Sequence, residues 1–516
     1  MLDGTPWLRL YARYRQRSLR DRDYAGQQTR QLLGLARRAA NTRFGREHGF
    51  STIRSVSDFQ ARVPLRRYDE FWQEYWKPVF PTLVDCTWPG LIPFFALSSG
   101  TSTGTTKFIP CSREMVSSNA KAALDLAVHH VTNRPRSRPM GGKIFLLGGS
   151  TDLVRRAPGV RSGDLSGIVA VTCPWWARSR YFPGPDLALI KDWEEKVATL
   201  ARRSLQEDIR VLAGVPSWLL ILFDRLCALR PGAEHGILAF YPHLELMIHG
   251  GVNFAPYRQR FLEITGQGRV DLRENYPASE GYIASADRGY GEGLRVVLDH
   301  GIFFEFVPLE ELGGPNPTRH WIGNVRKDVN YAIVLSTCAG LWSYVLGDTV
   351  RFTDLDPPRL LVTGRTSYSL SCFGEHLRAE EIEDAVAEAA RMIGRSVVDY
   401  SVGALFPDKP GELGGHLYVV EYAPAIPTPE EIRTFAEVLD RQLRERNEDY
   451  EGHRAGGFGL NPPRVVAMPP GAFAAWMRQR GKLGGQNKVP RIVTDPDLFR
   501  SLREFSGVPC LRPWIR

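Results

Sequence analysis

The chain has 516 residues, of which 43% are hydrophobic and 24% charged, and a formal net charge of +9 at pH 7. This length is too great for one ordinary core, so it predicts about two or three domains in a globular protein. The seven cysteines are scattered without a C-x-x-C pair, which disfavours a disulfide framework and a cysteine zinc site. The longest apolar run, residues 218–223, is far too short to span a bilayer, and no signal-peptide pattern is present. We therefore expect a cytoplasmic protein with no membrane insertion.

Much of the positive charge lies in residues 7–24, WLRLYARYRQRSLRDRDY. Such a stretch can attract an anionic partner, whether nucleic acid, a membrane or a phosphate substrate. Aspartates are interleaved with the arginines, however, and this pattern favours a solvated, arginine-rich helix face. Its large side chains have the character of packing positions: Trp7, Leu8, Leu10 and Tyr11. No nucleic-acid recognition motif accompanies the charge, so we expect no nucleic-acid partner.

The N-terminal region is predicted to be mostly helical as far as residue 80, with a candidate helix at 27–44. From residue 94 onward, strand-like runs alternate with helical patterns. Helices are expected at 113–132 and 190–204, and strands at 94–99, 143–149, 301–308 and 331–337. Alternation of this kind favours an α/β domain in which helices cover the sheets.

The pattern changes after residue 363. A helix is expected at 379–393, followed by strands at 397–406 and 416–423. A second helix is expected to begin at Thr428, a residue type favoured at N-caps, with Glu431 three positions later. Two strands between two helices predict a small α+β domain. We therefore divide the chain into an N-terminal domain, residues 1–363, and a C-terminal domain, residues 364–516.

The run SSGTSTGTTK, residues 98–107, allows three interpretations. Its segment 100–104 matches the G-x-S-x-G nucleophile elbow of serine hydrolases, for which His376, His416 and His453 would be the candidate bases. An elbow exposes one serine in a strand-to-helix turn, whereas this run contains seven hydroxyl residues. We therefore disfavour the hydrolase interpretation.

A phosphate-binding loop accounts for the same residues better. Glycine amides can approach a polyanion closely, hydroxyl groups donate hydrogen bonds, and lysine adds positive charge. The spacing is not that of a Walker A loop, which needs more residues between its glycines and a lysine directly after the second. A plain surface loop is the third interpretation. The candidate phosphate-binding residues are Ser98, Ser99, Gly100, Thr101, Ser102, Gly104 and Lys107.

Several segments carry recognisable motifs, in this order: ANTRFGREHGF, VPLRRYDEFW, SSGTSTGTTKFIP, ENYPASEGYIA, GIFFEFVP, TCAGLWSYVLGDTVRFTD and GKLGGQNKVPR. Together they resemble the adenylate-forming superfamily, which contains acyl-CoA synthetases, luciferases and adenylation domains. Within it the chain most closely resembles the Gretchen Hagen family of auxin-responsive acyl acid–amido synthetases, in its bacterial form. The resemblance implies a large α/β adenylation domain with helix-covered β-sheets and a small mobile C-terminal α+β domain.

The segment ENYPASEGYIA resembles the second nucleotide motif of the superfamily. Its Glu280, with the neighbouring hydroxyl of Ser279, can hold Mg²⁺ and contact an α-phosphate, because magnesium prefers carboxylate and phosphate oxygens. Glu280 is therefore a candidate metal ligand and catalytic residue, and Tyr276 offers an aromatic face for adenine. Gly250 and Gly251 end the run LELMIHGG, where glycine permits the backbone to lie along the adenine. In isolation, a surface glutamate, a packed tyrosine and an ordinary loop would be the simpler interpretations.

Asp348 follows Gly347 between two strand-like runs, where a carboxylate can accept hydrogen bonds from both ribose hydroxyls; a turn aspartate is the simpler alternative. The resemblance implies that Arg365, in VTGRTSY, makes a further nucleotide contact at a hinge. It also implies that Lys488, in GGQNKVPR, is the catalytic lysine. This lysine would neutralise the carboxylate and the α-phosphate as they approach each other. Lys482 is a nearby rival.

The chain departs from the family pattern at the ribose motif. Trp342, Ser343 and Val345 stand where plant members have Tyr, Arg and Arg, whereas Tyr344 and Asp348 remain. The motif therefore supports nucleotide binding more strongly than it supports recognition of an acceptor carboxylate.

We expect an ATP- and Mg²⁺-dependent ligase that activates a small carboxylic acid as an acyl-adenylate. The acyl group would then pass to an amine, for which an amino acid is the favoured candidate, with release of AMP. An acyl-CoA ligase using the same first step is the alternative, and the serine hydrolase is less favoured. A monomer or a homodimer is expected.

Overall fold

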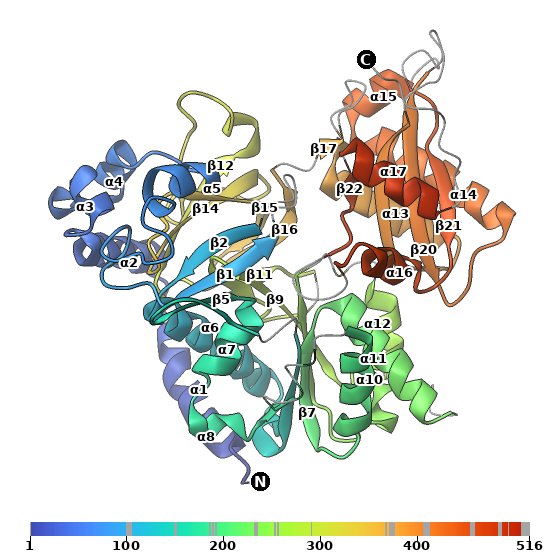
Figure 1. The fold of residues 1–516 in the computed structure, drawn as a ribbon, viewed down its shortest axis with the longest axis horizontal. Helices are drawn as coiled ribbons and strands as arrows, with labels where there is room; N and C mark the ends of the chain where they lie inside the picture. Colours follow the sequence, from blue (N-terminus) through green and yellow to red (C-terminus); the bar gives the residue numbers. More distant parts are fainter. Residues whose placement is uncertain are drawn as a thin grey trace. The chain divides into compact units, whose positions relative to one another are not determined.

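The computed structural model describes the chain except residues 1, 100–105, 149–151, 185–186, 188–189, 191–192, 232–235, 252–253, 255–256, 290, 367–368, 371–376, 406–412, 455–459, 483–487, 494 and 507–516. Of residues 99, 106, 175–176, 193–194, 217, 365, 369, 378, 448–449, 453 and 496, only the backbone is described. The chain divides into two compact units (Figure 1). Unit 1 comprises Met1–Val252 and Glu263–Val362, and unit 2 comprises Asn253–Leu262 and Thr363–Arg516.

Unit 1 begins with a series of helices, of which the second, third and fourth start at side-chain N-caps. They are α1 (Thr5–Leu19), α2 (Tyr24–Ala39), α3 (Arg43–Glu47), α4 (Val56–Arg62) and α5 (Tyr68–Phe71), with a short 3₁₀ segment at Phe50–Thr52 and a π segment at Trp72–Trp76. The expectation of one helix over 27–44 is wrong, because α2 ends at Ala39. Thr42 accepts a hydrogen bond from the Gly45 amide and caps a new helix, α3.

Helix α1 packs on α6 (Arg113–Asn133) through one face only. Leu8 is buried against Val128 of α6, as expected for a packing position. The packing expected at Trp7 and Leu10 is wrong, because these side chains are 76% and 58% exposed. The helical period of 3.6 residues places Trp7 and Leu10 away from the face that carries Leu8.

The described residues of unit 1 form a twelve-stranded sheet in the order β13-β12-β14-β15-β16-β11-β10-β9-β8-β7-β3-β6. The strands are β3 (Lys143–Leu147), β6 (Tyr181–Phe182), β7 (Ile209–Gly214), β8 (Leu246–Gly250), β9 (Asp271–Ala278), β10 (Gly281–Ser285), β11 (Leu294–Val296), β12 (Ile302–Pro308), β13 (His320–Trp321), β14 (Asn330–Thr337), β15 (Tyr344–Leu355) and β16 (Pro358–Arg365). The pairs β3/β6, β3/β7, β7/β8 and β8/β9 are parallel, whereas β9/β10, β12/β14 and β14/β15 are antiparallel.

Helices cover both faces of the parallel part of this sheet. On one face, Leu126 of α6 packs with Val211 of β7 and Leu246 of β8. The other face is covered by α11 (Pro216–Leu229), whose Leu219 side chain packs so close to Gly214 of β7 that a Cβ added to this glycine would lie 3.1 Å from it. Helix α10 (Trp193–Ser204) lies beside α11, as Figure 1 shows. The helix-covered α/β architecture expected from the alternation is thus confirmed.

A second sheet of unit 1 has the order β2-β1-β5-β4. Its strands are β1 (Phe94–Ser99), β2 (Thr106–Cys111), β4 (Val154–Ala157) and β5 (Val160–Gly163). Two further helices of unit 1 are α7 (Leu165–Thr172) and α8 (Trp175–Arg178), and its 3₁₀ segments are Pro139–Gly141, Ile237–Ala239 and Leu309–Glu311. Helix α12 (Arg258–Ile264) lies mostly in the segment Asn253–Leu262, which belongs to unit 2. The strand-forming run FFALSS therefore enters a sheet of its own, and it leads directly into the hydroxyl-rich run.

Unit 2 is an α+β unit around a sheet of order β21-β20-β19-β22, with a separate β17/β18 pair. Its elements are α13 (Ala379–Met392), α14 (Pro429–Arg446), α15 (Glu448–Arg454), α16 (Ala472–Gln479), α17 (Pro496–Phe505), β17 (Ser369–Leu370), β18 (Leu377–Arg378), β19 (Ser396–Leu405), β20 (Gly415–Ala423), β21 (Arg464–Met468) and β22 (Ile492–Val493). Alternate residues of β20 pack with α13 and α14 and, on the opposite face, with α16 and α17. The predicted helix start is confirmed, because Thr428 and Glu431 form a capping box.

The described helices include none that is both long enough and apolar enough to cross a membrane.

Candidate functional site

Glu280 lies at the tip of a β-hairpin. β9 and β10 pair with Gly281 opposite Ala278, which leaves Ser279 and Glu280 as the turn between them. Gly281 has a φ of 154°, and a Cβ there would meet a neighbouring side chain at 2.7 Å, so this position requires glycine. The Glu280 side chain is buried, and the Tyr344 hydroxyl donates a hydrogen bond of 3.2 Å to its Oε1. The hairpin therefore holds this carboxylate inside unit 1 rather than at its surface.

Asp348 lies in an irregular part of β15. The β14–β15 register shifts between Ala332 and Val334, so residues 346–348 bulge out of the ladder. Gly347, within the bulge, has a φ of 96°, a conformation that favours glycine. The bulge therefore explains why a glycine precedes Asp348 in the middle of a long strand.

A hydrogen bond joins the two predicted nucleotide motifs. The Tyr276 hydroxyl donates to Asp348 Oδ2 at 2.6 Å, and both side chains are buried. In the sheet order, β9 and β15 are four strands apart, which corresponds to about 19 Å in a flat sheet. The sheet must therefore curl to bring these strands together. This curl places Tyr276 and Asp348 in the same region as the Glu280–Tyr344 pair.

Gly250 and Gly251 lie at the end of β8, beside Tyr276. Gly250 pairs with Asn275, and a Cβ on Gly250 would lie 2.3 Å from the Asn275 carbonyl oxygen. Gly251 has a φ of 82°. Both positions therefore require glycine for reasons internal to the fold, and their contact with adenine stays a prediction.

The hydroxyl-rich run joins two strands of a hairpin. β1 and β2 pair antiparallel, with Ser98 opposite Lys107 and Ser99 opposite Thr106. A nucleophile elbow needs a strand followed by a helix, so this arrangement contradicts the serine hydrolase alternative. The predicted phosphate-binding residues Gly100, Thr101, Ser102 and Gly104 lie outside the described residues.

Tyr68 positions the lysine of this hairpin. The Lys107 Nζ lies 5.3 Å from the centroid of the Tyr68 ring, a cation–π contact. The Tyr68 hydroxyl accepts a hydrogen bond of 2.9 Å from the Phe108 amide. Burial raises the pKa of Tyr68 to about 12, so the hydroxyl stays protonated at neutral pH. Sequence reasoning missed Tyr68, for which the only signal was its place in the segment VPLRRYDEFW.

Glu274 is a second residue that sequence reasoning missed. It lies two positions before Tyr276, on the same face of β9, and is the register partner of His249 in β8. Burial raises the pKa of Glu274 to about 7 and lowers that of His249 to about 3. At neutral pH the imidazole is therefore uncharged, and the Glu274 carboxyl holds its proton to a higher pH than an exposed glutamate does.

Lys488 and Arg365 belong to unit 2. Lys488 is exposed and precedes β22, whereas Arg365 ends β16 and its side chain lies outside the described residues. Burial raises the pKa of Asp399 to about 6, although the charges of Arg491 and Lys488 act to lower it. The approach of Lys488 to the nucleotide residues of unit 1 stays a prediction.

Two residues that depart from the plant pattern serve the fold. Trp342 is fully buried among aromatic rings, and its Nε1 donates a hydrogen bond of 2.9 Å to the Thr87 carbonyl. The Ser343 hydroxyl donates to Glu305 Oε2 at 2.9 Å and accepts from Arg319 Nη2 at 2.6 Å. Glu305 and Arg319 also form an ion pair of 2.8 Å. These side chains therefore face the interior rather than a ligand.

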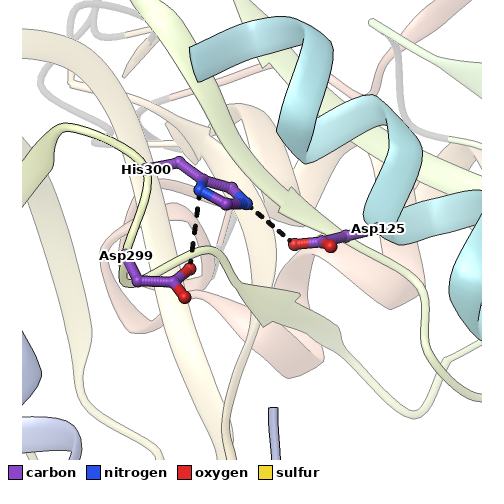
Figure 2. Close-up of side chains that lie close together, drawn as sticks. All are labelled: Asp125, Asp299 and His300. Carbon is purple, nitrogen blue, oxygen red and sulfur yellow. Dashed lines mark hydrogen bonds and ion pairs between the residues drawn. The ribbon is translucent and has the colours of Figure 1, made fainter. Parts of the chain in front are cut away.

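A separate cluster has the composition of a metal site. Asp125, Asp299 and His300 lie close together, as Figure 2 shows, with His300 Nε2 3.0 Å from Asp125 Oδ2. However, the Arg15 guanidinium donates to both Asp125 oxygens at 2.7 Å and to both Asp299 oxygens at 2.5 and 2.8 Å. Burial acts to raise the pKa of both aspartates, but the hydrogen bonds and positive charges of Arg15 and His300 together outweigh this effect, so each pKa lies below its usual value. This cluster is therefore an ion-pair network that fastens α1 to α6.

Three models of one family match the chain in order. The GH3 family N-terminal domain matches residues 20–151, the GH3 family central domain matches residues 295–365, and the GH3 family C-terminal domain matches residues 380–497. Together these matches account for the greater part of the sequence.

Among curated relatives, the indole-3-acetic acid-amido synthetase GH3.8 of Oryza sativa subsp. indica is 28% identical over 215 residues, which is 39% of this chain. The match spans 35% of that relative's length, well under two thirds.

Two solved structures show the fold. The GH3.15 acyl acid amido synthetase has a TM-score of 0.76 at 16% identity and covers 93% of both chains. A 2-hydroxyisobutyryl-CoA ligase has a TM-score of 0.61 at 15% identity and covers 93% of this chain and 91% of its own. These likenesses confirm the expected adenylate-forming enzyme fold, with a large α/β part and a smaller C-terminal α+β part. With the three models that match it in order, the chain belongs to the GH3 family, the Gretchen Hagen family that its motifs resemble.

Proposed function

We propose that this chain is an ATP-dependent acyl acid–amido synthetase. In the first step, a carboxylate oxygen of the acid attacks the α-phosphorus of ATP, and pyrophosphate leaves. In the second step, an amino-acid amine attacks the acyl carbon, the C–N bond forms, AMP leaves and the amine loses a proton. The observation that carries the proposal is the hydrogen bond from Tyr276 to Asp348, because it unites two nucleotide motifs that lie far apart in sequence.

Each residue of unit 1 has a chemical role in this proposal. Asp348 would accept hydrogen bonds from the ribose hydroxyls, with Tyr276 orienting its carboxylate and lying against the adenine. The hairpin from Ser98 to Lys107 would bind the phosphates through amides, hydroxyls and one positive charge. Gly250 and Gly251 would lie along the adenine.

Glu280 is the proposed Mg²⁺ ligand. Glu280 and Ser279 offer oxygen atoms, the donor type that magnesium prefers, and the buried hairpin tip holds the Glu280 carboxylate in place. Bound Mg²⁺ would offset the negative charge of the phosphates. Tyr344 would orient the Glu280 carboxylate through its hydrogen bond.

The proposal assigns the remaining steps to the C-terminal part. Residues 1–363 would form the adenylation domain, and residues 364–516 a mobile domain that turns at Arg365. Lys488 would stabilise the negative charge that develops as the acid meets the α-phosphate. Movement of this domain would then clear the site for the amine.

An acyl-CoA ligase is the second candidate function. The observation that favours it is the likeness of fold to the 2-hydroxyisobutyryl-CoA ligase. Both candidates share the adenylation step and differ in the nucleophile, which is a thiol of CoA in one case and an amine in the other.

The test is a two-stage assay. Exchange of labelled pyrophosphate into ATP, screened over aryl, indolyl and fatty acids, reports acyl-adenylate formation without any acceptor. The activating acid is then incubated with ATP and either an amino-acid mixture or CoA, and products are identified by mass spectrometry. We expect acid-dependent exchange followed by an amide. A thioester without an amide would favour the CoA ligase, and the absence of exchange with every acid would reject both.

We place this activity in the cytoplasm, in a monomer or a homodimer. Among the described residues, Cys86, Cys111, Cys173 and Cys338 are thiols outside any disulfide, which supports a reducing compartment. That the chain is of the bacterial form of the family stays a prediction, because the relative GH3.8 comes from a plant.

A further inference from the structure

The most exposed large hydrophobic side chains of the described residues gather at helix α1. Leu2 is 89% exposed, Trp7 76%, Tyr14 71% and Leu10 58%, and no other such side chain exceeds 53%. Trp7, Leu10 and Tyr14 follow one another at intervals of three and four residues, so they form a stripe along one face of the helix. Isolated exposed apolar residues are ordinary, but a contiguous stripe indicates an interaction surface.

The stripe is flanked by positive charge. α1 contains no Asp or Glu. Arg13 and Arg17 are exposed, and they lie three and seven positions after Leu10, so they border the stripe. Among the described side chains, neither arginine pairs with a carboxylate. The exposed face of α1 is therefore both apolar and cationic.

Other residues hold α1 rigidly and present this face outward. Arg15 is buried in its network with Asp125 and Asp299. Arg9 donates hydrogen bonds to the carbonyls of Pro135 and Ser137 at 2.6 and 2.9 Å. The arginines of α1 thus fall into two groups, one that fastens the helix and one that faces solvent.

We propose that the stripe of Trp7, Leu10 and Tyr14, with Arg13 and Arg17, docks this protein on an anionic phospholipid surface. Tryptophan and tyrosine rings prefer the interface between headgroups and acyl chains, and arginine pairs with phosphate through a planar fork. A helix with this combination lies in the plane of the membrane. A second copy of the chain is a poorer partner, because a two-fold contact through this face would bring like-charged arginines together without any carboxylate. The proposal does not depend on the proposed enzymatic activity.

The test is co-sedimentation of the full-length protein with vesicles. One set of vesicles contains phosphatidylcholine alone, and the other contains equal parts of phosphatidylcholine and phosphatidylserine. We expect binding to the anionic vesicles, weakened by salt, and little binding to the neutral ones. Arg13→Gln with Arg17→Gln should weaken it about thirtyfold, since each arginine contributes about fivefold near an anionic surface. Trp7→Ser with Tyr14→Ser should weaken it by about tenfold or more.

Matched controls distinguish the effect of this face from the effect of net charge and from that of exposed apolar side chains elsewhere. Arg202→Gln with Arg203→Gln removes two exposed arginines from α10, and Met392→Ser removes a side chain that is 50% exposed on α13. Both controls should bind like the unmodified protein, and circular dichroism should show the same melting temperature for every variant. Unchanged binding by the stripe variant, or equal loss in the α10 control, would overturn the proposal. Failure to bind anionic vesicles would also overturn the proposal. If the stripe residues are then needed for dimerisation, the partner is a second copy of the chain, and if they are needed for DNA binding, the partner is a nucleic acid.

Discussion

Two groups of buried or partly buried carboxylates in unit 1 differ in the side chains that hold them. Asp348 and Glu280 accept hydrogen bonds from the uncharged hydroxyls of Tyr276 and Tyr344, whereas Asp125 and Asp299 are bridged by the Arg15 guanidinium. The hydrogen bond from a phenol orients a carboxylate without itself supplying a positive charge, whereas a bidentate arginine supplies one. We infer that the first arrangement suits a ligand-binding site and that the second suits a structural fastening.

The largest expected effect is on stability, at the structural cluster. Arg15→Ala leaves Asp125 and Asp299 without their shared cation, and removal of one partner from a buried ion pair costs about 3–5 kcal/mol. We expect the free energy of unfolding, measured by urea denaturation, to fall by this amount. Arg17→Ala, at an exposed position of the same helix, should change it by no more than about 0.5 kcal/mol. A loss below about 1 kcal/mol for Arg15→Ala would mean that the cluster does not fasten α1.

The next largest effect is on the rate of adenylation. Unlike Arg15, Lys488 is exposed. Lys488→Ala should slow acid-dependent pyrophosphate exchange about 100- to 1,000-fold and leave ATP affinity nearly unchanged. Lys482→Ala is the matched control, because Lys482 is also exposed in the same segment. If Lys482→Ala slows the exchange and Lys488→Ala does not, the catalytic role passes to Lys482.

A smaller effect is expected on nucleotide affinity at the tyrosine-held carboxylates. Asp348→Asn removes the charge that would bind the ribose hydroxyls, so the dissociation constant for ATP should rise about 10- to 100-fold. Isothermal titration calorimetry measures it directly. Asp328→Asn, at an exposed turn, should leave it unchanged. An unaltered affinity in Asp348→Asn would remove Asp348 from the nucleotide site.

The hydrogen bond that orients Asp348 should matter less than its charge. Tyr276→Phe removes only the hydroxyl, which predicts a loss of about 1 kcal/mol, or about fivefold in ATP affinity. Tyr276→Phe combined with Asp348→Asn should weaken ATP binding by less than the product of the two single effects, because the two residues act as a pair. Full additivity in this double-mutant cycle would show that the hydroxyl does not act through Asp348.

The smallest effect is a change in the pH dependence of stability. Burial raises the pKa of Glu274 from 4.5 to about 7, so the folded state favours its protonated form. This stabilising contribution is complete below pH 4.5 and is lost as the pH rises through about 7. Glu274→Gln should therefore flatten the decline of unfolding free energy across this interval. The exposed Glu310 is the control, and a Glu310→Gln variant should keep the wild-type profile. An identical profile for Glu274→Gln and the wild type would contradict the raised pKa.

Local signals in the sequence were enough for the architecture and for the choice of candidate site residues. The alternation of helical and strand-like runs predicts the helix-covered sheet, and the Thr428–Glu431 pair predicts a helix start that the structure contains. Motif order also identifies Tyr276, Glu280 and Asp348, which the curled sheet then brings into one region. These features depend on short stretches of chain, where residue type and spacing carry the information.

Long-range contacts were beyond sequence reasoning. Arg15 and Asp299 are separated by 284 positions, and nothing in either segment indicates that they meet. The helix expected over 27–44 breaks because of a cap at Thr42, and Trp7 and Leu10 face outward because α6 covers only the opposite face of α1. The sequence also did not explain why Trp342 and Ser343 differ from the plant pattern. The structure explains it, because both side chains bond to interior partners, which are Thr87, Glu305 and Arg319.

The most direct test of the central claim is a crystal structure of the protein with Mg²⁺ and a non-hydrolysable ATP analogue. The account predicts ribose hydroxyls within hydrogen-bonding distance of Asp348, adenine against Tyr276, and phosphates between Glu280 and the Ser98–Lys107 hairpin. Nucleotide density at any other place, with Asp348 and Glu280 facing only protein atoms, would contradict it.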